Sequence, residues 1–164
     1  MIYNYWTDGA ASLNLVNGEY QRAAGGWAWA LIQEDKIVAK ESGGLPITSN
    51  NAMELTAISQ ALNHARENTQ GGGIINIMSD SAYCINIFTK WLSGWKLNGM
   101  TRGKKHEPIE NVDLIKEIDK TINTLSSNFI GVNWIKVKGH SNSQWNNYVD
   151  DLAVKAKKEN SVFE

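Results

Sequence analysis

Residues 48–66 constrain the fold most, because they combine a helical period with an acid on the apolar side. Four residues recur at helical spacing and form a stripe that should meet a core: Ile58, Ala61, Leu62 and Ala65. Glu54 lies on the same stripe. An unpaired carboxylate that points inward is costly, so we expect Glu54 to have a cation, a hydrogen-bond network or another partner. The alternative is that Glu54 caps the first helical turn, where the helix dipole favours an acid.

Length and cysteine content set the broad class of the protein. A chain of 164 residues can bury a core without a disulfide or a structural metal. Cys84 is the only cysteine, which excludes an intramolecular disulfide and fits a reducing compartment. No stretch approaches the roughly 20 apolar residues that span a membrane. We therefore expect one soluble, cytoplasmic, monomeric domain over residues 1–164, without membrane contact.

The charge is neutral overall but uneven along the chain. The formal net charge is -1, so total charge does not indicate a nucleic-acid binder. No acid lies between Asp80 and Glu107, and that segment carries five basic residues: Lys90, Lys96, Arg102, Lys104 and Lys105. This is a local basic patch, although a run of charge is more often a solvated face.

Hydrophobic patterning predicts an α/β fold. Alternation and apolar runs indicate five strands, at residues 2–7, 26–33, 36–42, 74–78 and 132–137. Helical spacing indicates helices at residues 50–67, 81–89, the first half of 90–106, 111–124 and 144–158. Residues 10–26 show no clear period and are interpreted as a loop, and Glu34-Asp35 as a hairpin turn. We expect a five-stranded mixed sheet flanked by helices, antiparallel in its first three strands and parallel thereafter.

Three acids have related settings in this arrangement. Asp8 and Asp80 each follow a predicted strand, and Glu54 lies on the inward face of a helix. If the first and fourth strands are neighbours and the helix covers them, the three carboxylates converge. Like charges at such distances raise one another's pKa unless a cation neutralises them. Mg²⁺ suits this setting, and two such ions about 3.5–4 Å apart can promote phosphodiester hydrolysis.

The motifs and their order resemble type 1 ribonuclease H over about residues 2–158. They are Thr7-Asp8-Gly9, Asn51-Ala52-Met53-Glu54-Leu55, Ser79-Asp80-Ser81, Glu110-Asn111-Val112-Asp113-Leu114, Val137-Lys138-Gly139-His140-Ser141 and Asp150-Asp151-Leu152-Ala153. The resemblance implies a ribonuclease H-like fold and endonucleolytic cleavage of the RNA strand of RNA–DNA hybrids. It also implies two Mg²⁺ ions, with Mn²⁺ as a substitute, and 5′-phosphate products.

The resemblance assigns the catalytic residues by position. The metal-binding carboxylates become Asp8, Glu54, Asp80 and Asp150. His140 becomes the histidine of a flexible loop that assists proton transfer or product release. Its alternative role is that of a solvated loop histidine. Asp150 is preferred to Asp151 because it lies ten residues after His140, as the last acid of the family does; the helix faces do not separate the two.

The resemblance also assigns substrate-binding residues: Asn50, Asn51, Trp91, Lys96, Lys104, Lys105 and Asn146. The amides of Asn50 and Asn51 would read the RNA 2′-OH across the minor groove, and their alternative role is helix capping. Residues 90–105 resemble a basic protrusion that binds the hybrid backbone through salt-dependent phosphate contacts. The alternative for Trp91 and Trp95 is that they pack the small core of that segment.

Some positions depart from the family pattern, and two other functions remain open. Residues 11–26 are longer than the usual glycine-rich turn, and the unusual residues are Ala52, Ala82 and Met100. One rival function is a hybrid-binding module that has lost catalysis, against which the intact set of acids argues. The other is an integrase-like or exonuclease enzyme of the same broad fold. The segment around Gly139-His140, the basic protrusion and the Asn50-Asn51 pair argue against that rival.

Overall fold

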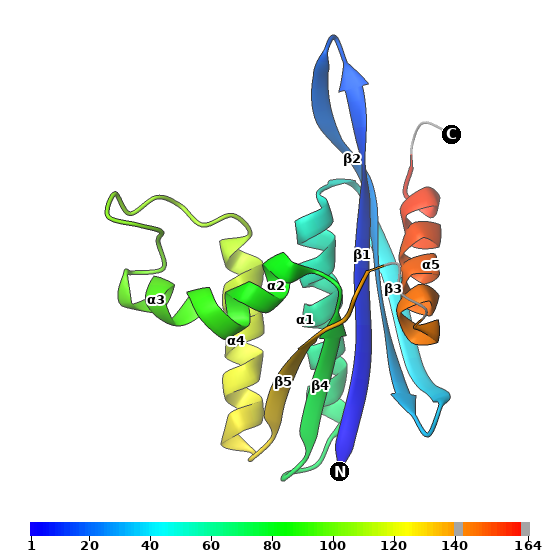
Figure 1. Cartoon of the computed structure of the whole chain (residues 1–164), viewed down its shortest axis with the longest axis vertical. Coiled ribbons are helices and arrows are strands. Elements are labelled where there is room, and N and C mark those ends of the chain that lie inside the picture. Colours follow the sequence, from blue (N-terminus) through cyan, green and yellow to red (C-terminus); the bar gives the residue numbers. More distant parts are fainter. Residues whose placement is uncertain (140–142, 162–164) are drawn as a thin grey trace.

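Five strands form one mixed sheet in the order β3-β2-β1-β4-β5 (Figure 1). The structure is a computed structural model that describes residues 1–139 and 143–161. The strands are β1 (Ile2–Val16), β2 (Glu19–Gln33), β3 (Lys36–Thr48), β4 (Ile74–Ser79) and β5 (Gly131–Lys136). β2 pairs antiparallel with β1 and β3, whereas β4 pairs parallel with β1 and β5. The mixed sheet predicted from the sequence is confirmed.

Helices cover both faces of this sheet (Figure 1). They are α1 (Asn50–Asn68), α2 (Ala82–Asn86), the π-helix η1 (Ile87–Trp91), α3 (Leu92–Leu97), α4 (Val112–Ser127) and α5 (Gln144–Glu159). α1 packs on β1 and on α4, whereas α5 packs on β1 and β2 from the other side. None of the helices in the described residues is long and apolar enough to span a membrane.

The apolar stripe of α1 builds the larger core. Ser49 caps the helix, because its side chain accepts a hydrogen bond from the backbone N–H of Ala52. The four residues of the predicted stripe are fully buried: Ile58, Ala61, Leu62 and Ala65. Burial of a large aliphatic side chain contributes about 1.5–3 kcal/mol, so this face holds α1 firmly on the sheet. The helix that carries Glu54 is thereby fixed relative to β1.

Small residues let α5 approach the opposite face. Ala28 and Ala30 of β2 are fully buried and pack against Val149 and Ala153 of α5. A Cβ atom on Gly26 would overlap the backbone of α5 at the carbonyl oxygen of Ala153. The absence of a side chain at Gly26 therefore sets how closely α5 lies on the sheet.

The prediction of a loop at residues 10–26 is wrong. β1 continues to Val16 and β2 begins at Glu19, so the segment is a long antiparallel hairpin. Its turn is Asn17-Gly18, and both residues have positive φ, as a two-residue type I′ hairpin turn requires. Leu13 and Leu15 alternate with Ser12 and Asn14, as a strand with one apolar face requires, and Asn-Gly is a common pair in hairpin turns, so the sequence carries both signals of a hairpin here. β3 likewise extends beyond the predicted end, to Thr48.

The predicted helix at 81–89 continues into the basic segment without a break. α2, η1 and α3 follow one another from Ala82 to Leu97, with one π-helical stretch between two α-helical ones. π-helical insertions are uncommon and often lie near functional sites. Here the insertion separates α2, which begins beside Asp80, from α3, which carries Trp95 and Lys96.

We expect Gly26→Ala to lower the free energy of unfolding by about 2–3 kcal/mol, because the added methyl group displaces the α5 backbone. Urea unfolding of the purified variant measures this loss. Gly94→Ala is the matched control: no atom lies within 4 Å of the added Cβ, and alanine favours the helix. Equal stability of Gly26→Ala and the parent would contradict the close packing of α5.

Candidate active site

Three carboxylates meet where β1 and β4 separate. β1 pairs with β4 only as far as Trp6, and Asp8 follows two residues later inside β1. Asp80 follows the end of β4, and Glu54 extends from the first turns of α1. Each residue offers an oxygen, and these oxygens all lie within 4.8 Å of one another. The expectation that the three acids converge is met, although Asp8 lies within a strand that continues past it.

A backbone hydrogen bond fixes Glu54 in this cluster. The N–H of Gly9 donates to Oε1 of Glu54 at 2.6 Å. A Cβ atom on Gly9 would overlap the backbone of Glu54, so only glycine lets α1 come this close to β1. Among the described residues, Oε2 of Glu54 has no hydrogen-bond partner, although it is buried. A buried carboxylate oxygen without a partner is costly, which indicates that this oxygen faces a cation when the site is loaded.

Burial and mutual repulsion raise the pKa of the clustered acids. Burial is the largest cause for Asp8, whose pKa also rises because Glu54 and Asp80 are close. Burial raises the pKa of Glu54 to about 7, against the Gly9 N–H, which lowers it. Without a cation, the cluster therefore keeps protons at pH values where ordinary carboxyl groups have lost them.

α5 carries a fourth acid near the cluster, on the other face of the sheet. Asp150 is half-buried and lies near enough to Asp8 to contribute to the raised pKa of Asp8, although it is not among the three residues whose oxygens lie within 4.8 Å of one another. The neighbouring Asp151 is exposed. Asn146 lies one turn before Asp150 and is buried, and its Oδ1 has no partner among the described residues. The two acids thus differ in burial, and the assignment of Asp150 rather than Asp151 as a metal ligand stays a prediction.

The segment that precedes His140 passes beside Asp80. The backbone N–H of Val137 donates to the carbonyl oxygen of Ser79 at 2.9 Å. A Cβ atom on Gly139 would lie 3.7 Å from Oδ2 of Asp80. His140 itself lies outside the described residues, so its assignment stays a prediction.

The donor set fits a divalent cation with a preference for oxygen. The three clustered side chains are carboxylates, which are the ligands that Mg²⁺, Ca²⁺ and Mn²⁺ prefer. The raised pKa values and the partnerless Oε2 of Glu54 show that positive charge would relieve an existing electrostatic strain. The site therefore fits the predicted metal in chemistry as well as in spacing.

The N-terminus of α1 lies beside this cluster. Asn50 is exposed, and its Oδ1 accepts a hydrogen bond from the N–H of Ala11 at 2.6 Å. Asn51 is half-buried. Neither side chain caps the helix, because Ser49 does so. The capping alternative for these two asparagines is therefore wrong, and Asn50 instead ties the helix start to β1.

The tryptophans of the basic segment form an aromatic cluster. Trp91 packs against Trp95 and Tyr83, with ring centroids 5.8 and 6.4 Å apart. Trp91 remains 39% exposed. The three rings line a cavity of about 400 Å³ together with Arg102, Ile109 and Glu110. The rings thus pack the segment and also leave an aromatic surface open to a ligand.

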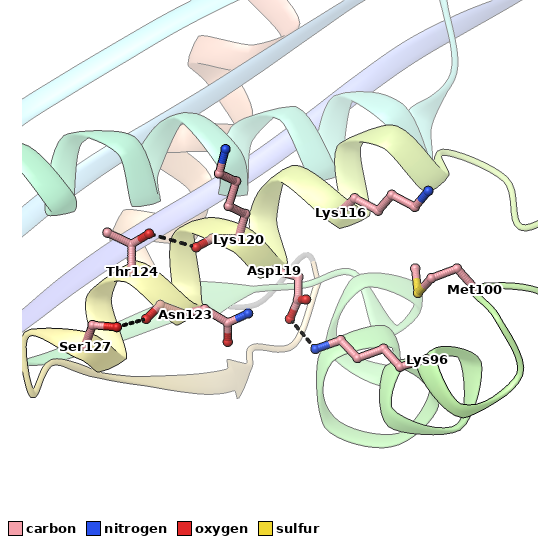
Figure 2. A pocket seen from close by; sticks show the side chains of 8 residues that line it. All are labelled: Lys96, Met100, Lys116, Asp119, Lys120, Asn123, Thr124 and Ser127. Carbon is pink, nitrogen blue, oxygen red and sulfur yellow. Dashed lines mark hydrogen bonds and ion pairs between the residues drawn. The ribbon is translucent and has the colours of Figure 1, made fainter.

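Acids from elsewhere in the chain neutralise part of the basic segment. Nζ of Lys96 lies 2.8 Å from Oδ1 of Asp119 in α4, and Figure 2 shows the two side chains pointing at one another. They line a shallow cavity of about 450 Å³ between α3 and α4. Arg102 lies 3.7 Å from Glu107. The sequence showed no acid between Asp80 and Glu107, but it did not show that the fold brings Asp119 to Lys96.

The remaining cations are free to meet solvent. Lys104 and Lys105 are exposed in a turn that two backbone hydrogen bonds close, between Arg102 and Glu107. The substrate-binding residues named from the sequence therefore fall into separate settings. Asn50 and Asn51 lie at the start of α1, Asn146 lies on α5, and Trp91, Lys96, Lys104 and Lys105 lie on the basic segment.

Sequence reasoning missed two contributors to this site. The Gly9 N–H holds Glu54, a contact between residues 45 positions apart that no local pattern indicates. Tyr83 completes the aromatic cluster around Trp91. Eight residues of a regular helix rise about 12 Å, so the sequence spacing of Tyr83 and Trp91 did not predict their contact.

The fold and the site together indicate the class of protein. A mixed sheet in this order, with an acidic cluster where β1 and β4 separate, describes a hydrolase that depends on a divalent metal. Residues 2–158 match the family model described as RNase H. The chain belongs to the RNase H family.

Individual relatives agree with this assignment. The ribonuclease H of Moorella thermoacetica is 40% identical over 150 residues, which cover 90% of this chain and 86% of that protein. The ribonuclease H of Acetivibrio thermocellus is 38% identical over 159 residues, which cover 95% of each chain. Among solved structures, LC9-RNase H1, a type 1 RNase H with the type 2 active-site motif, has a TM-score of 0.78 at 24% identity. The match covers 98% of this chain and 74% of that one.

We expect Asp8→Asn to raise the free energy of unfolding of the metal-free protein by about 1–3 kcal/mol, because a neutral amide replaces a buried carboxyl that must otherwise stay protonated or repel its neighbours. Urea unfolding in EDTA measures the change. The exposed Asp151→Asn is the matched control and should leave stability unchanged.

The same urea unfolding, repeated at several pH values, tests the pH dependence of the parent's stability. Raised folded-state pKa values mean that the parent loses stability as the pH rises from about 4.5 to about 7. A parent that becomes more stable over this range would contradict the raised pKa of Glu54.

Proposed function

We propose that this protein is a Mg²⁺-dependent endonuclease that hydrolyses the RNA strand of RNA–DNA hybrids and leaves 5′-phosphate ends. The observation that carries the proposal is the carboxylate cluster of Asp8, Glu54 and Asp80 in a chain of the RNase H family. A similar fold occurs in the foamy viral protease-reverse transcriptase in complex with an RNA/DNA hybrid, with a TM-score of 0.75 at 21% identity. The match covers 96% of this chain and 20% of that one. This structural match supports the fold, whereas the proposed substrate is inferred from membership of the RNase H family.

Asp8, Glu54, Asp80 and Asp150 would hold two Mg²⁺ ions, for which Mn²⁺ would substitute. When bound, such ions activate the attacking water and stabilise the leaving oxygen of the phosphodiester. The partnerless Oε2 of Glu54 and the raised pKa values support this role for the acids. The Gly9 N–H keeps Glu54 oriented toward the cluster, so the ligand set is arranged before metal or substrate arrives.

His140 would exchange a proton during hydrolysis or product release, since imidazole titrates near neutral pH. Support comes from the neighbouring Gly139, which adjoins Asp80. No covalent bond between enzyme and substrate is needed for this reaction, because water is the nucleophile.

The hybrid would bind across the start of α1 and the basic segment. Asn50 and Asn51 would contact the minor groove, where amides can read the RNA 2′-OH. Trp91 would present its exposed ring, and Lys104 and Lys105 would contact backbone phosphates. Asn146 would contact the substrate beside Asp150. Because Lys96 forms an ion pair with Asp119, we propose that the main role of Lys96 is to position α3 against α4.

The experiment that tests the function is cleavage of an end-labelled RNA–DNA hybrid with Mg²⁺, beside duplex RNA, single-stranded RNA and duplex DNA. We expect only the RNA strand of the hybrid to be cut, in the interior, and EDTA to abolish cutting. Hybrid binding without cleavage under Mg²⁺ or Mn²⁺ would indicate a binding module instead. Cleavage of duplex DNA would indicate another branch of the fold.

We expect Asp150→Asn to lower kcat by about 10²–10⁴-fold, because a metal-binding carboxylate is lost at the cluster. Single-turnover cleavage of the hybrid measures the loss. The exposed neighbour provides a matched control, since Asp151→Asn makes the same chemical change one residue away and should retain activity within about twofold. Equal losses in both variants would remove Asp150 from the proposed ligand set.

We expect Lys104→Ala/Lys105→Ala to raise KM while kcat is retained, because these exposed cations would contact phosphates away from the cluster. The slope of log KM against log salt should fall by about one to two. Steady-state cleavage at several salt concentrations measures both effects. The exposed Lys36→Ala/Lys40→Ala on β3 is the control and should leave the slope unchanged. A double Lys104/Lys105 variant with the parental slope would show that this turn does not meet the backbone.

A further inference from the structure

The cavity between α3 and α4, called here the α3–α4 cavity, carries positive charge that the protein does not balance (Figure 2). Its lining includes three lysines, Lys96, Lys116 and Lys120, and one acid, Asp119. The acid is already paired, since its Oδ1 lies 2.8 Å from Nζ of Lys96. Neither Lys116 nor Lys120 forms an ion pair with any of the residues that the structure describes. Three lysines against one acid leave the lining with a net charge of +2.

The two unpaired lysines are neighbours on one helix face. Lys116 and Lys120 are four residues apart on α4, and both are exposed. Like charges at this spacing repel one another, and a bound anion would relieve the repulsion. An ordinary solvated face offers no enclosed space, whereas these lysines border a cavity whose opposite wall carries Lys96. This end of the α3–α4 cavity is therefore suited to an anion.

The other end of the α3–α4 cavity is neutral and rich in hydrogen-bonding groups. The hydroxyls of Thr124 and Ser127 donate to the carbonyl oxygens of Lys120 and Asn123, at 3.1 and 3.0 Å (Figure 2). Their oxygens therefore keep lone pairs that can accept hydrogen bonds from a ligand. The exposed Asn123 adds an amide on the same side of α4 as Asp119, four residues before it. A ligand that fits both ends has an anionic part and a neutral part with hydroxyl groups.

We propose that the α3–α4 cavity binds a nucleoside di- or triphosphate. Its phosphates would lie at Lys116 and Lys120, because a lysine ammonium group is a point charge that suits phosphate oxygens. Its ribose hydroxyls would donate to Thr124 and Ser127, and the amide of Asn123 would meet the base. The cavity of about 450 Å³ is larger than a phosphate group needs and lies in the range of small-molecule sites, roughly 300–1,000 Å³.

This site is separate from the proposed substrate surface. Trp91, Trp95 and Arg102 line a different cavity, which shares no residue with the α3–α4 cavity. Lys104 and Lys105, in the exposed turn, do not line it either. The proposal therefore goes beyond the proposed function, and nucleotide binding can be measured without any cleavage assay.

Titration of the full chain with ADP by calorimetry tests the site. EDTA is present, so that no metal ion can carry the nucleotide to the carboxylate cluster. We expect saturable binding by the parent and an affinity about tenfold lower in Lys116→Gln/Lys120→Gln, whose exposed positions tolerate glutamine. Lys155→Gln/Lys158→Gln removes the same charge from exposed positions of α5 and should bind ADP as the parent does.

A second comparison tests the neutral end of the cavity. Pyrophosphate should bind about 5–10-fold more weakly than ADP, because it lacks the nucleoside contacts. Thr124→Val/Ser127→Ala removes the two hydroxyls at exposed positions and should weaken ADP binding without changing pyrophosphate binding.

Four results would overturn the proposal. No saturable ADP binding by the parent would show that the lysines form a solvated face. An equal loss of affinity in the Lys155/Lys158 variant would reduce the effect to long-range charge. Loss of binding in Lys104→Ala/Lys105→Ala, with none in the Lys116/Lys120 variant, would place the nucleotide on the exposed turn. Equal affinities for ADP and pyrophosphate would exclude the nucleoside contacts.

Discussion

The hydrogen bond from Gly9 to Glu54 is the contact on which the site depends. It requires a glycine in the middle of β1, and it places the only charged side chain on the buried stripe of α1 next to Asp8. Without a bound cation, gathering these acids is unfavourable. Burial and mutual repulsion disfavour the charged carboxylates, and they raise the pKa of both Asp8 and Glu54. Packing of α1 and α5 on the two faces of the sheet holds the carboxylates together against that repulsion.

The elements that bear the carboxylates could be predicted because their signals are local. Strand 74–78 is a run of apolar residues, and the stripe of α1 has a clear helical period. Convergence of the acids required the first and fourth strands to be neighbours, and β1 and β4 do pair in the structure. The choice of Asp150 over Asp151 came from the family resemblance, because both lie off the apolar stripe of α5. In the structure Asp150 is half-buried and contributes to the raised pKa of Asp8, whereas Asp151 is exposed.

Other features depend on tertiary contacts that could not be predicted from the sequence. Residues 10–26 were predicted to be a loop although Leu13 and Leu15 alternate with Ser12 and Asn14, because the stretch that alternates is short and β pairing depends on a partner strand. Lys96 was expected at the substrate surface, yet its ion pair joins it to Asp119, 23 residues away. The sequence predicted a helix at residues 81–89 and did not predict the π-helical stretch from Ile87 to Trp91. The acidic cluster and the basic segment nevertheless lie on connected elements, since α2 begins directly after Asp80.

Mg²⁺ titration by calorimetry tests most directly whether the buried, repelling carboxylates form a divalent-cation site. Measurements at pH 7 in two buffers of different ionisation enthalpy report both the affinity and the protons released. Binding should release about one proton per protein, because the raised pKa values leave the cluster partly protonated. Binding should be lost in Asp8→Asn. Mg²⁺ binding without proton release, or equal binding by Asp8→Asn, would contradict the electrostatic basis of the site.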